Sequence, residues 1–592
     1  MRFIFFLTLI AVLFIPYSFT SGPDEWYPFV ISEKLDPDSP ANIGKLVLDP
    51  PAGKHGFVKV KDGHFYFEDG TRAKFWGTNL CFSACFPSKE QAKMLADRIA
   101  FFGFNAVRLH QMDFYFEPKG IFEDTNPENS DPQSKTTTVL SKKQLDRLDY
   151  LIFQLEKRGI YIDMNLLVSR HFTEADGVIN ADKLGMAAKP VSMFNPKLIE
   201  LQKKYAKDLL THDNPYTGLR YCDDPAVALV EITNENSLFM SDNAELPRYY
   251  AEEMQNLRKE WLGEAGKPDK IIKNDLYMYL EKKFFRGMTD FLKNNCGVKV
   301  PITGIGGYWN PEDAEAQESC DFIDKHAYWD HPSFPNIAWD DNDFRIQNQS
   351  MLTDNTLGII NEIKNAAPIN KPYTITEWNH CYPNRHAYET PLLITAEAIK
   401  NNWDGLFQFD FKAFLIEHPQ FNSIQNYFET ASNPQQLLLT AIGSGLLRSN
   451  NSIVDGSTEN GIFTVRSNSL AGAVGSIKDR TLHLGPFELT ADNNCAVFLL
   501  ETAPKKFIFI QVGEIRNKNS RWEKDGRFCW GTAPTLLKKI GITLKTDNKK
   551  IKIYTLDASG KRAQEILANE KEGINSFYLK SVSSPWFEID AD

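Results

Sequence analysis

Long hydrophobic runs are nearly absent from this 592-residue sequence. Beyond the N-terminal region no segment is long and apolar enough for a membrane span, so we expect none in the mature chain. Lysine and arginine form no long run, and the net charge is −11 with a pI near 5.6, which argues against nucleic acid as a partner. No Gly-x-Gly-x-x-Gly follows a predicted strand, so a dinucleotide-binding fold has no support.

Cysteine is sparse as well, and this excludes a dense disulfide scaffold. The eight cysteines are scattered along the chain: Cys81, Cys85, Cys222, Cys296, Cys320, Cys381, Cys495 and Cys529. Cys81 and Cys85 have no His or Cys cluster near them, so we do not expect a zinc site. Buried free thiols, or one or two disulfide bridges, remain the two expected states.

The one long apolar run lies at the N-terminus. Arg2 precedes an apolar stretch at residues 3–15, and small polar residues follow it. This pattern predicts a secretory signal peptide, residues 1–21, and therefore a secreted or periplasmic protein. A membrane anchor is the alternative, but the run is short for a span.

A chain of this length predicts more than one domain, and its apolar content of 42% with 24% charged residues is typical of a soluble globular protein. We predict an N-terminal segment at residues 22–72, with a hairpin around Asp62-Gly63 that caps a barrel. A catalytic barrel follows at residues 73–448, and a C-terminal β domain at residues 449–592.

Short apolar strands alternate with helices through the middle of the chain. The helices carry clear start signals, for example Asn195 followed by Pro196. Eight strands favour a closed (β/α)8 TIM barrel: 73–78, 106–109, 160–166, 227–233, 301–303, 322–326, 373–376 and 405–409. Helices are expected at 89–102, 141–158, 196–210, twice within 247–294, and at 354–366, 391–401 and 435–447.

After Arg448 the pattern changes to short strands between turns, which predicts a small all-β sandwich. The expected strands are 462–465, 471–477, 496–500, 507–512, 550–556 and 576–579. We interpret this region as a unit that packs on the barrel; glycan binding is the alternative.

Two glutamates follow buried strands of the predicted barrel. Glu235 ends the stretch VALVEITNE, and Glu377 ends the stretch YTITE. A carboxylate at the end of a buried strand is costly to place there without a role. In a β/α barrel the carboxyl ends of the strands carry the catalytic residues, and strands four and seven stand on roughly opposite sides. We therefore expect Glu235 and Glu377 to face one another across the mouth.

Glycoside cleavage needs two such carboxyl groups. Asn234-Glu235 and Glu377-Trp378, with Arg108 on strand two and His326-Ala327-Tyr328 on strand six, resemble the retaining β-glycosidases of glycoside hydrolase clan A. The cellulase-type family, family five, fits best, and the resemblance covers residues 75–411.

The resemblance implies Glu235 as acid/base and Glu377 as nucleophile. It also implies that Asn234 binds the sugar 2-hydroxyl, that Arg108 braces the nucleophile, and that His326 and Tyr328 orient it or the substrate. No metal or organic cofactor is needed, the substrate partner is a poly- or oligosaccharide, and an endo-β-glycanase is favoured.

The sequence departs from the family pattern at two strand ends. Strand three ends in Asp163-Met164-Asn165 where a His is common, and strand eight reads Gln408-Phe409-Asp410 where a Trp is common. We still expect Asn165, Gln408 and His110 near the sugar. Trp378 adjoins the nucleophile and is the best candidate for stacking, although a core position is the alternative. Other aromatics, Tyr308, Trp309, Trp329 and Trp339, are open between core and stacking roles.

The expected mechanism is double displacement. Glu377, held ionised by Arg108, attacks the anomeric carbon, while Glu235, kept protonated by the nearby negative charge, protonates the leaving oxygen. The alternatives are an exo-acting β-glycosidase, an agarase-like member of the clan, and a carbohydrate-binding barrel without activity.

Overall fold

The structure is a computed structural model that describes most of the chain. The described residues are 25–239, 245–265, 273–307, 310–353, 357–368, 370–415, 421–448, 455–580 and 582–591. The predicted signal peptide and the aromatic pair Tyr308 and Trp309 lie outside these ranges.

Eight parallel strands form the predicted barrel. They are β4 (Phe75–Cys81), β5 (Ala106–His110), β6 (Tyr161–Leu167), β9 (Val227–Asn234), β10 (Ile302–Gly306), β11 (Ile323–Trp329), β12 (Tyr373–His380) and β13 (Gly405–Lys412). Their order is β10-β9-β6-β5-β4-β13-β12-β11, and β10 also lies beside β11, so the barrel is nearly closed. The strands are almost wholly buried, as expected for parallel strands covered on both faces. The predicted fold class is confirmed.

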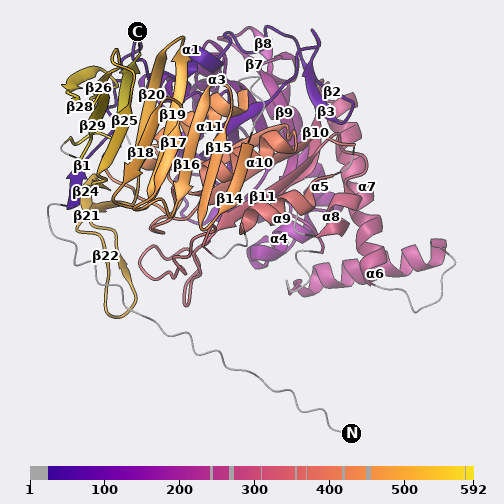
Figure 1. Cartoon of the computed structure of the whole chain (residues 1–592). Coiled ribbons are helices and arrows are strands. Elements are labelled where there is room, and N and C mark those ends of the chain that lie inside the picture. The colour runs from indigo at the N-terminus through magenta and orange to yellow at the C-terminus, as the bar shows by residue number, and fades with distance from the viewer. Residues whose placement is uncertain are drawn as a thin grey trace.

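Helices cover the outside of the barrel (Figure 1). They include α2 (Lys89–Phe101), α3 (Lys142–Glu156), α5 (Pro196–Leu210), α7 (Lys273–Asn294), α8 (Pro311–Ala316), α9 (Ile359–Ala366), α10 (Thr390–Lys400) and α11 (Pro434–Arg448). Helix α6 (Arg248–Ala265) instead projects away from the barrel in Figure 1. Local signals set their starts: the side chain of Asn195 accepts a hydrogen bond from the Leu198 amide, and Ser88 forms a capping box with Gln91. Helix α9 is shorter than the predicted span.

A hairpin of β2 (Val58–Lys61) and β3 (His64–Phe67) covers the end of the barrel at which the strands begin. Phe65 and Phe67 share a buried cluster with Phe75, Tyr161 and Phe322 near the strand starts. This end is therefore closed by apolar packing, and only the opposite end can hold a site.

Two large antiparallel sheets make up most of the C-terminal region, as predicted, beside a smaller sheet with β1 (Trp26–Pro28) and a two-stranded hairpin. One large sheet has the order β14-β15-β16-β19-β20-β30-β26-β27, and the other has the order β17-β18-β25-β29-β28. The first contains β14 (Asp455–Glu459), β15 (Ile462–Arg466), β16 (Leu470–Gly475), β19 (Cys495–Ala503), β20 (Lys506–Val512), β26 (Lys552–Leu556), β27 (Arg562–Ile566) and β30 (Trp586–Asp590). The second contains β17 (Thr481–Leu484), β18 (Phe487–Ala491), β25 (Ile542–Thr546), β28 (Asn569–Lys571) and β29 (Ile574–Tyr578).

One face of the larger sheet packs against the barrel. Alternate residues of β19 divide between two cores: Val497 and Leu499 face the smaller sheet, while Phe498 and Leu500 belong to the same buried cluster as the barrel. The N-terminal strand β1 (Trp26–Pro28) also pairs with β24 (Thr532–Lys538) of the C-terminal region. The two regions therefore share one hydrophobic core.

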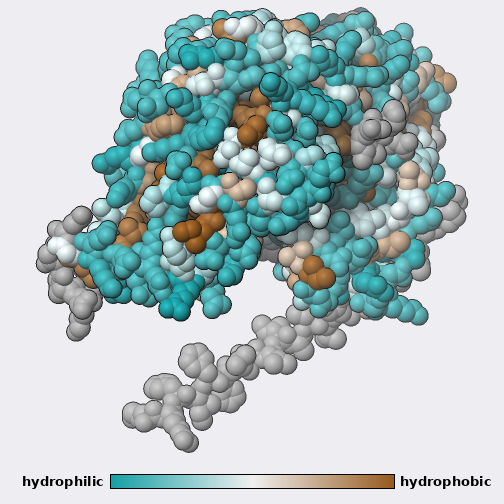
Figure 2. Space-filling view, turned by 180° about the vertical axis from the view of Figure 1, so that it is seen from behind, coloured by the Kyte–Doolittle hydropathy of each residue, from teal (hydrophilic) through white to brown (hydrophobic). Residues whose placement is uncertain are grey.

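The face shown in Figure 2 is mostly hydrophilic, and its hydrophobic residues lie in small separate patches. No helix of the described ranges is long and apolar enough to cross a membrane. All eight cysteines are described and free, and seven of them are buried. This agrees with the first of the two states expected for the thiols.

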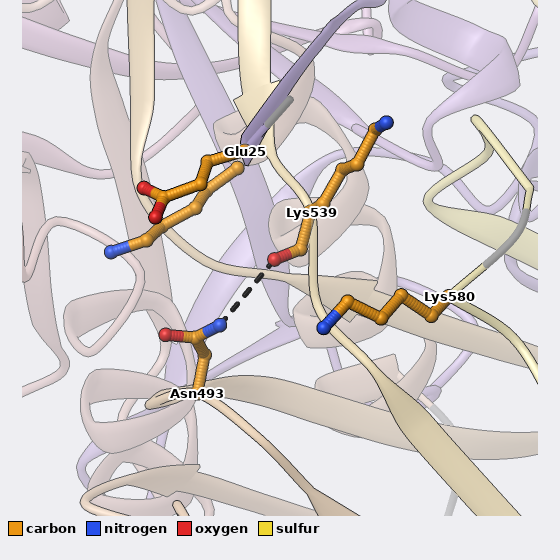
Figure 3. A pocket seen from close by; sticks show the side chains of 5 residues that line it. Glu25, Asn493, Lys539 and Lys580 are labelled. Carbon is orange, nitrogen blue, oxygen red and sulfur yellow. Dashed lines mark hydrogen bonds between the residues drawn. The ribbon is translucent and has the colours of Figure 1, made fainter. Parts of the chain in front are cut away.

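A small lysine-rich cavity of about 200 Å³ lies between the N-terminal segment and the C-terminal sheets, lined by Glu25, Asn493, Lys538, Lys539 and Lys580 (Figure 3). Acidic neighbours already neutralise two of these lysines, because Glu514 lies 2.7 Å from Lys538 and Asp492 lies 2.7 Å from Lys580. None of the residues that line this cavity belongs to the barrel.

Candidate active site

Glu235 and Glu377 meet at the open end of the barrel. Glu377 lies within β12, near its carboxyl end, and Glu235 directly follows β9. One oxygen of each carboxylate and one ring nitrogen of His326 all lie within 4.8 Å of one another. The side chain of Glu377 is 6% exposed and that of Glu235 is 30% exposed. The structure thus brings the two predicted carboxylates together, with Glu235 the more accessible.

Arg108 is the buried hub beneath Glu377. Its Nη1 donates to Glu377 Oε1 at 2.7 Å, and its Nε and Nη2 donate to the two oxygens of Glu231 at 3.0 and 2.7 Å. Nη2 also donates to Asn234 Oδ1 at 2.7 Å, and Nη1 to Asn79 Oδ1 at 3.1 Å. A planar guanidinium can serve several acceptors at fixed angles, so this network fixes the orientation of Glu377.

Tyr328 and His326 contact the carboxylate oxygens of Glu377 and Glu235 that Arg108 does not bind. The Tyr328 hydroxyl donates to Glu377 Oε2 at 2.5 Å. His326 Nδ1 lies 2.8 Å from Glu235 Oε1 and 3.5 Å from Glu377 Oε2. Its Nε2 lies 3.1 Å from the Thr376 hydroxyl and 3.3 Å from Asp324 Oδ2. His326 therefore stands between the two glutamates, with an acidic residue behind it.

The charges of this cluster favour a proton on His326 over one on Glu235, which differs from the expectation that Glu235 is kept protonated. Burial raises the pKa of Glu235. The hydrogen bond and the charge of His326 lower it by more, so that the pKa of Glu235 lies below its usual value. Burial opposes the charged form of His326, yet the charge of Glu377 and the hydrogen bonds to Asp324 and Glu235 raise its pKa to about 10. The resting site thus places one imidazolium between two carboxylates.

His110 and Asn165 lie deeper in the barrel. His110 Nε2 is 3.5 Å from Glu377 Oε1, and burial together with the charge of Arg108 holds the pKa of His110 well below its usual value. His110 is therefore a neutral neighbour of Glu377. Asn165 is fully buried and donates to Glu231. Asn165 therefore contacts the buried Glu231 side of the Arg108 network, and its burial leaves it little access to a sugar.

Two predicted site residues point away from the mouth. Trp378 is fully buried and packs against the Trp76 ring at 5.9 Å. Gln408, its partner in the ladder, donates to Gln436 of α11 at 2.9 Å. Successive side chains of a strand face opposite sides, so the residue next to the inward-facing Glu377 must face the helices. The predicted sugar contacts of Trp378 and Gln408 were wrong.

Phe409 lies at the mouth of the barrel, although it was not predicted from the sequence as a site residue. Its ring contacts those of His110 at 5.8 Å and Tyr328 at 5.9 Å, and both of these residues approach Glu377. Phe409 is also only partly buried. It therefore supplies an apolar wall beside the two carboxylates. Successive side chains of a strand face opposite sides, so a Gln408 that faces the helices would have placed Phe409 at the mouth.

Two charged residues of the site were also missed. Glu231, three positions before Asn234, is fully buried and forms the second half of the Arg108 network. A glutamate inside the apolar run of a strand was the available signal. Lys189, in α4 (Ala188–Val191), donates to the carbonyls of Asn234 and Glu235 at 3.0 and 3.3 Å. It comes from a loop helix, and its pattern in the sequence gives no sign of this contact.

Glu235, His326 and Glu377 are also the only three side chains of the described ranges whose donor atoms are grouped closely enough for a metal ion. Each donor already takes part in the hydrogen bonds given above. A cation at this position would compete with the imidazolium for both carboxylates.

Comparison with known proteins gives no family assignment. No protein-family model matches the sequence, and no curated protein matches it. Solved structures with a similar chain path include a glycoside hydrolase family 5 mannosidase from Rhizomucor miehei, with 14% identity over 66% of this chain and 98% of that chain, at a TM-score of 0.45.

Two further similar structures are an endo-β-1,4-mannanase from Thermotoga petrophila and a β-glucanase from Saccharophagus degradans. The first has 12% identity over 75% of this chain and 96% of that chain, at a TM-score of 0.44. The second has 13% identity over 67% and 95%, at a TM-score of 0.37. At this level of similarity the functional interpretation rests on the site geometry alone.

Proposed function

We propose that the protein is a retaining β-glycoside hydrolase that cleaves a poly- or oligosaccharide. The observation that carries this proposal is the placement of Glu235 and Glu377 near the carboxyl ends of β9 and β12, three strands apart around the barrel, with carboxylate oxygens within 4.8 Å. Retaining enzymes hold their carboxyl groups about 5–5.5 Å apart, whereas inverting enzymes leave about 6.5–9.5 Å for a water. The short separation supports direct attack by one carboxylate.

Glu377 is the nucleophile in this proposal. Hydrogen bonds from Arg108 and Tyr328 fix both of its oxygens. One oxygen forms a bond to the anomeric carbon while the bond to the leaving oxygen breaks. Phe409 supplies the apolar wall beside the reacting sugar.

Glu235 is the acid and later the base, and His326 supplies its proton. When Glu377 attacks the sugar, its carboxylate becomes a neutral ester. His326 then loses the negative charge that most favours the protonated form of the imidazole. The proton can then pass from Nδ1 to Glu235 Oε1, 2.8 Å away, and on to the leaving oxygen. In the second step Glu235 removes a proton from water, which attacks the glycosyl-enzyme, and the proton returns to His326.

We also propose that the protein acts outside the cytoplasm and cleaves within chains rather than at their ends. Support for export is the N-terminal sequence pattern with Arg2 and the apolar stretch 3–15. A screen of the purified protein against β-glucan, mannan, xylan and galactan, with product sizes measured over time, tests the activity and the mode of action. No reducing sugar from any polymer, or only single sugars from the first minutes, would contradict the corresponding part of the proposal.

A further inference from the structure

An exposed tryptophan lies on the loop that leaves the site after β11. Trp339 is 61% exposed, which makes it the most exposed aromatic side chain of the described residues. Its ring contacts only the rings of His331 at 5.6 Å and Phe334 at 5.1 Å. A tryptophan gains much free energy from burial, so leaving this ring in water calls for an explanation.

The same loop connects Trp339 to the catalytic carboxylates. The His331 ring lies 5.5 Å from the Tyr328 ring, and the Tyr328 hydroxyl donates to Glu377. The Phe428 ring packs against both the Tyr328 ring at 4.8 Å and the His331 ring at 5.6 Å, and so stabilises the contact between these two rings. Trp339 is thus two ring contacts away from Tyr328, whose hydroxyl holds Glu377.

A hairpin of the C-terminal region holds this loop. The hairpin contains β22 (Arg521–Trp522) and β23 (Phe528–Cys529) and projects beyond the C-terminal sheets in Figure 1. Trp530 Nε1 donates to the Asp341 carbonyl at 2.7 Å, and the Phe528 amide donates to the Asn342 carbonyl at 3.4 Å. Both acceptors lie within three residues of Trp339.

Phe344 joins the hairpin to the barrel. It is fully buried, and its ring contacts Trp522 at 5.2 Å, Phe528 at 5.6 Å and Tyr427 at 4.7 Å. The loop is therefore packed from both sides at Phe344, while the stretch 335–339, which includes Ile337 and Trp339, is exposed. Such a framework keeps an exposed ring in one place, which a binding surface needs.

We propose that Trp339 is a distal sugar-stacking platform of the cleft and that the β22–β23 hairpin positions it. Its occupant is a sugar unit of a β-linked chain, one or more units away from the bond that is cleaved. The inference rests on the proposed glycosidase function and adds to it a requirement for chain length. It also makes the C-terminal region part of substrate recognition.

The test uses the full chain and the cello- and manno-oligosaccharide series from two to six units. Trp339→Ala should raise KM about 2- to 10-fold for the longest oligomers that the wild type cleaves, with kcat little changed. KM for the shortest cleaved oligomer should stay the same, and Trp339→Phe should restore most of the difference. Tyr578→Ala is the matched control, because Tyr578 is 54% exposed on β29, far from this loop in the chain.

A second variant tests the hairpin. Trp530→Phe keeps a ring in the aromatic packing but removes the hydrogen bond to Asp341, so it should raise KM for long oligomers with the same dependence on length. Melting curves identify any variant that fails to fold. Equal KM values for Trp339→Ala and wild type on every oligomer would overturn the platform and leave the glycosidase proposal standing.

Calorimetric titration of Glu377→Ala, with and without Trp339→Ala, separates the two proposals further. If the wild type cleaves nothing but the added Trp339→Ala change weakens binding of long oligomers only, the platform stands and the glycosidase function fails. If no oligomer binds, the platform fails as well.

Discussion

Arg108 Nη1 lies 2.7 Å from Glu377 Oε1, and the opposite edge of the same guanidinium is occupied by Glu231. One buried cation therefore serves two carboxylates, of which one faces the mouth and the other lies inside the barrel. Neither acid can be moved without a change at the other, and the position of Glu377 depends on strands β5 and β9 as well as on its own strand.

Arg108→Lys should lower kcat by about 10²- to 10³-fold, because an ammonium group cannot reach both carboxylates with fixed geometry. Stability should fall by about 3–5 kcal/mol, since a buried carboxylate is left without its partner. Steady-state kinetics and urea unfolding measure the two effects. The control is Arg158→Lys, at an ion pair with the largely exposed Asp97. An Arg108→Lys enzyme with normal kcat would contradict the bracing role.

Glu377→Ala and Glu235→Ala should each remove most turnover and leave the melting temperature nearly unchanged or raised. Sodium azide should partly restore turnover of Glu377→Ala, because a small anion can occupy the space left by the carboxylate and attack the sugar. The azide-dependent product should be a glycosyl azide, which mass spectrometry detects. Both variants retaining wild-type activity would show that the chemistry lies elsewhere.

The pKa of His326 makes stability depend on pH. Its folded-state pKa is raised from 6.5 to about 10, so its charge stabilises the fold fully below about pH 6.5. This contribution is lost as the pH rises toward 10, at about 1.4 kcal/mol per pH unit. His326→Asn should therefore be less stable than wild type at pH 6 and approach it at pH 9–10, as measured by urea unfolding. A stability difference that is constant over this range would contradict the imidazolium.

A chain that ends at Arg448 should melt at a lower temperature than the full chain. The C-terminal sheet shares the barrel core through Phe498 and Leu500, and interfaces between domains bury about 600–1,500 Å², so truncation exposes apolar surface. The β22–β23 hairpin leads us to expect weaker binding of long oligomers as well. A shortened chain with unchanged melting and affinity would contradict both expectations.

The barrel and the two glutamates could be predicted because the strands form a regular pattern and each glutamate follows a buried strand, whereas Arg108, His326 and Tyr328 were expected from the resemblance to the clan A glycosidases. Trp378 was misplaced because its adjacency to Glu377 was weighed above the alternation of the strand, and Gln408 was misplaced because the family pattern has a tryptophan near the sugar at the end of strand eight. The contacts of Lys189 and of the β22–β23 hairpin could not be predicted, since they join segments far apart in the chain that no local pattern relates. The proton on His326 depends on three acidic groups that meet only in the folded barrel.

The stereochemistry of the first product tests the central claim most directly. Proton NMR in the first minutes of hydrolysis, on whichever polymer the screen identifies, reports the anomeric configuration of the new reducing end before it equilibrates. Glu377 and Glu235 with carboxylate oxygens within 4.8 Å predict that the β configuration appears first and the α form follows only by mutarotation. An α product from the start would mean that water attacks directly, and it would contradict the covalent role of Glu377.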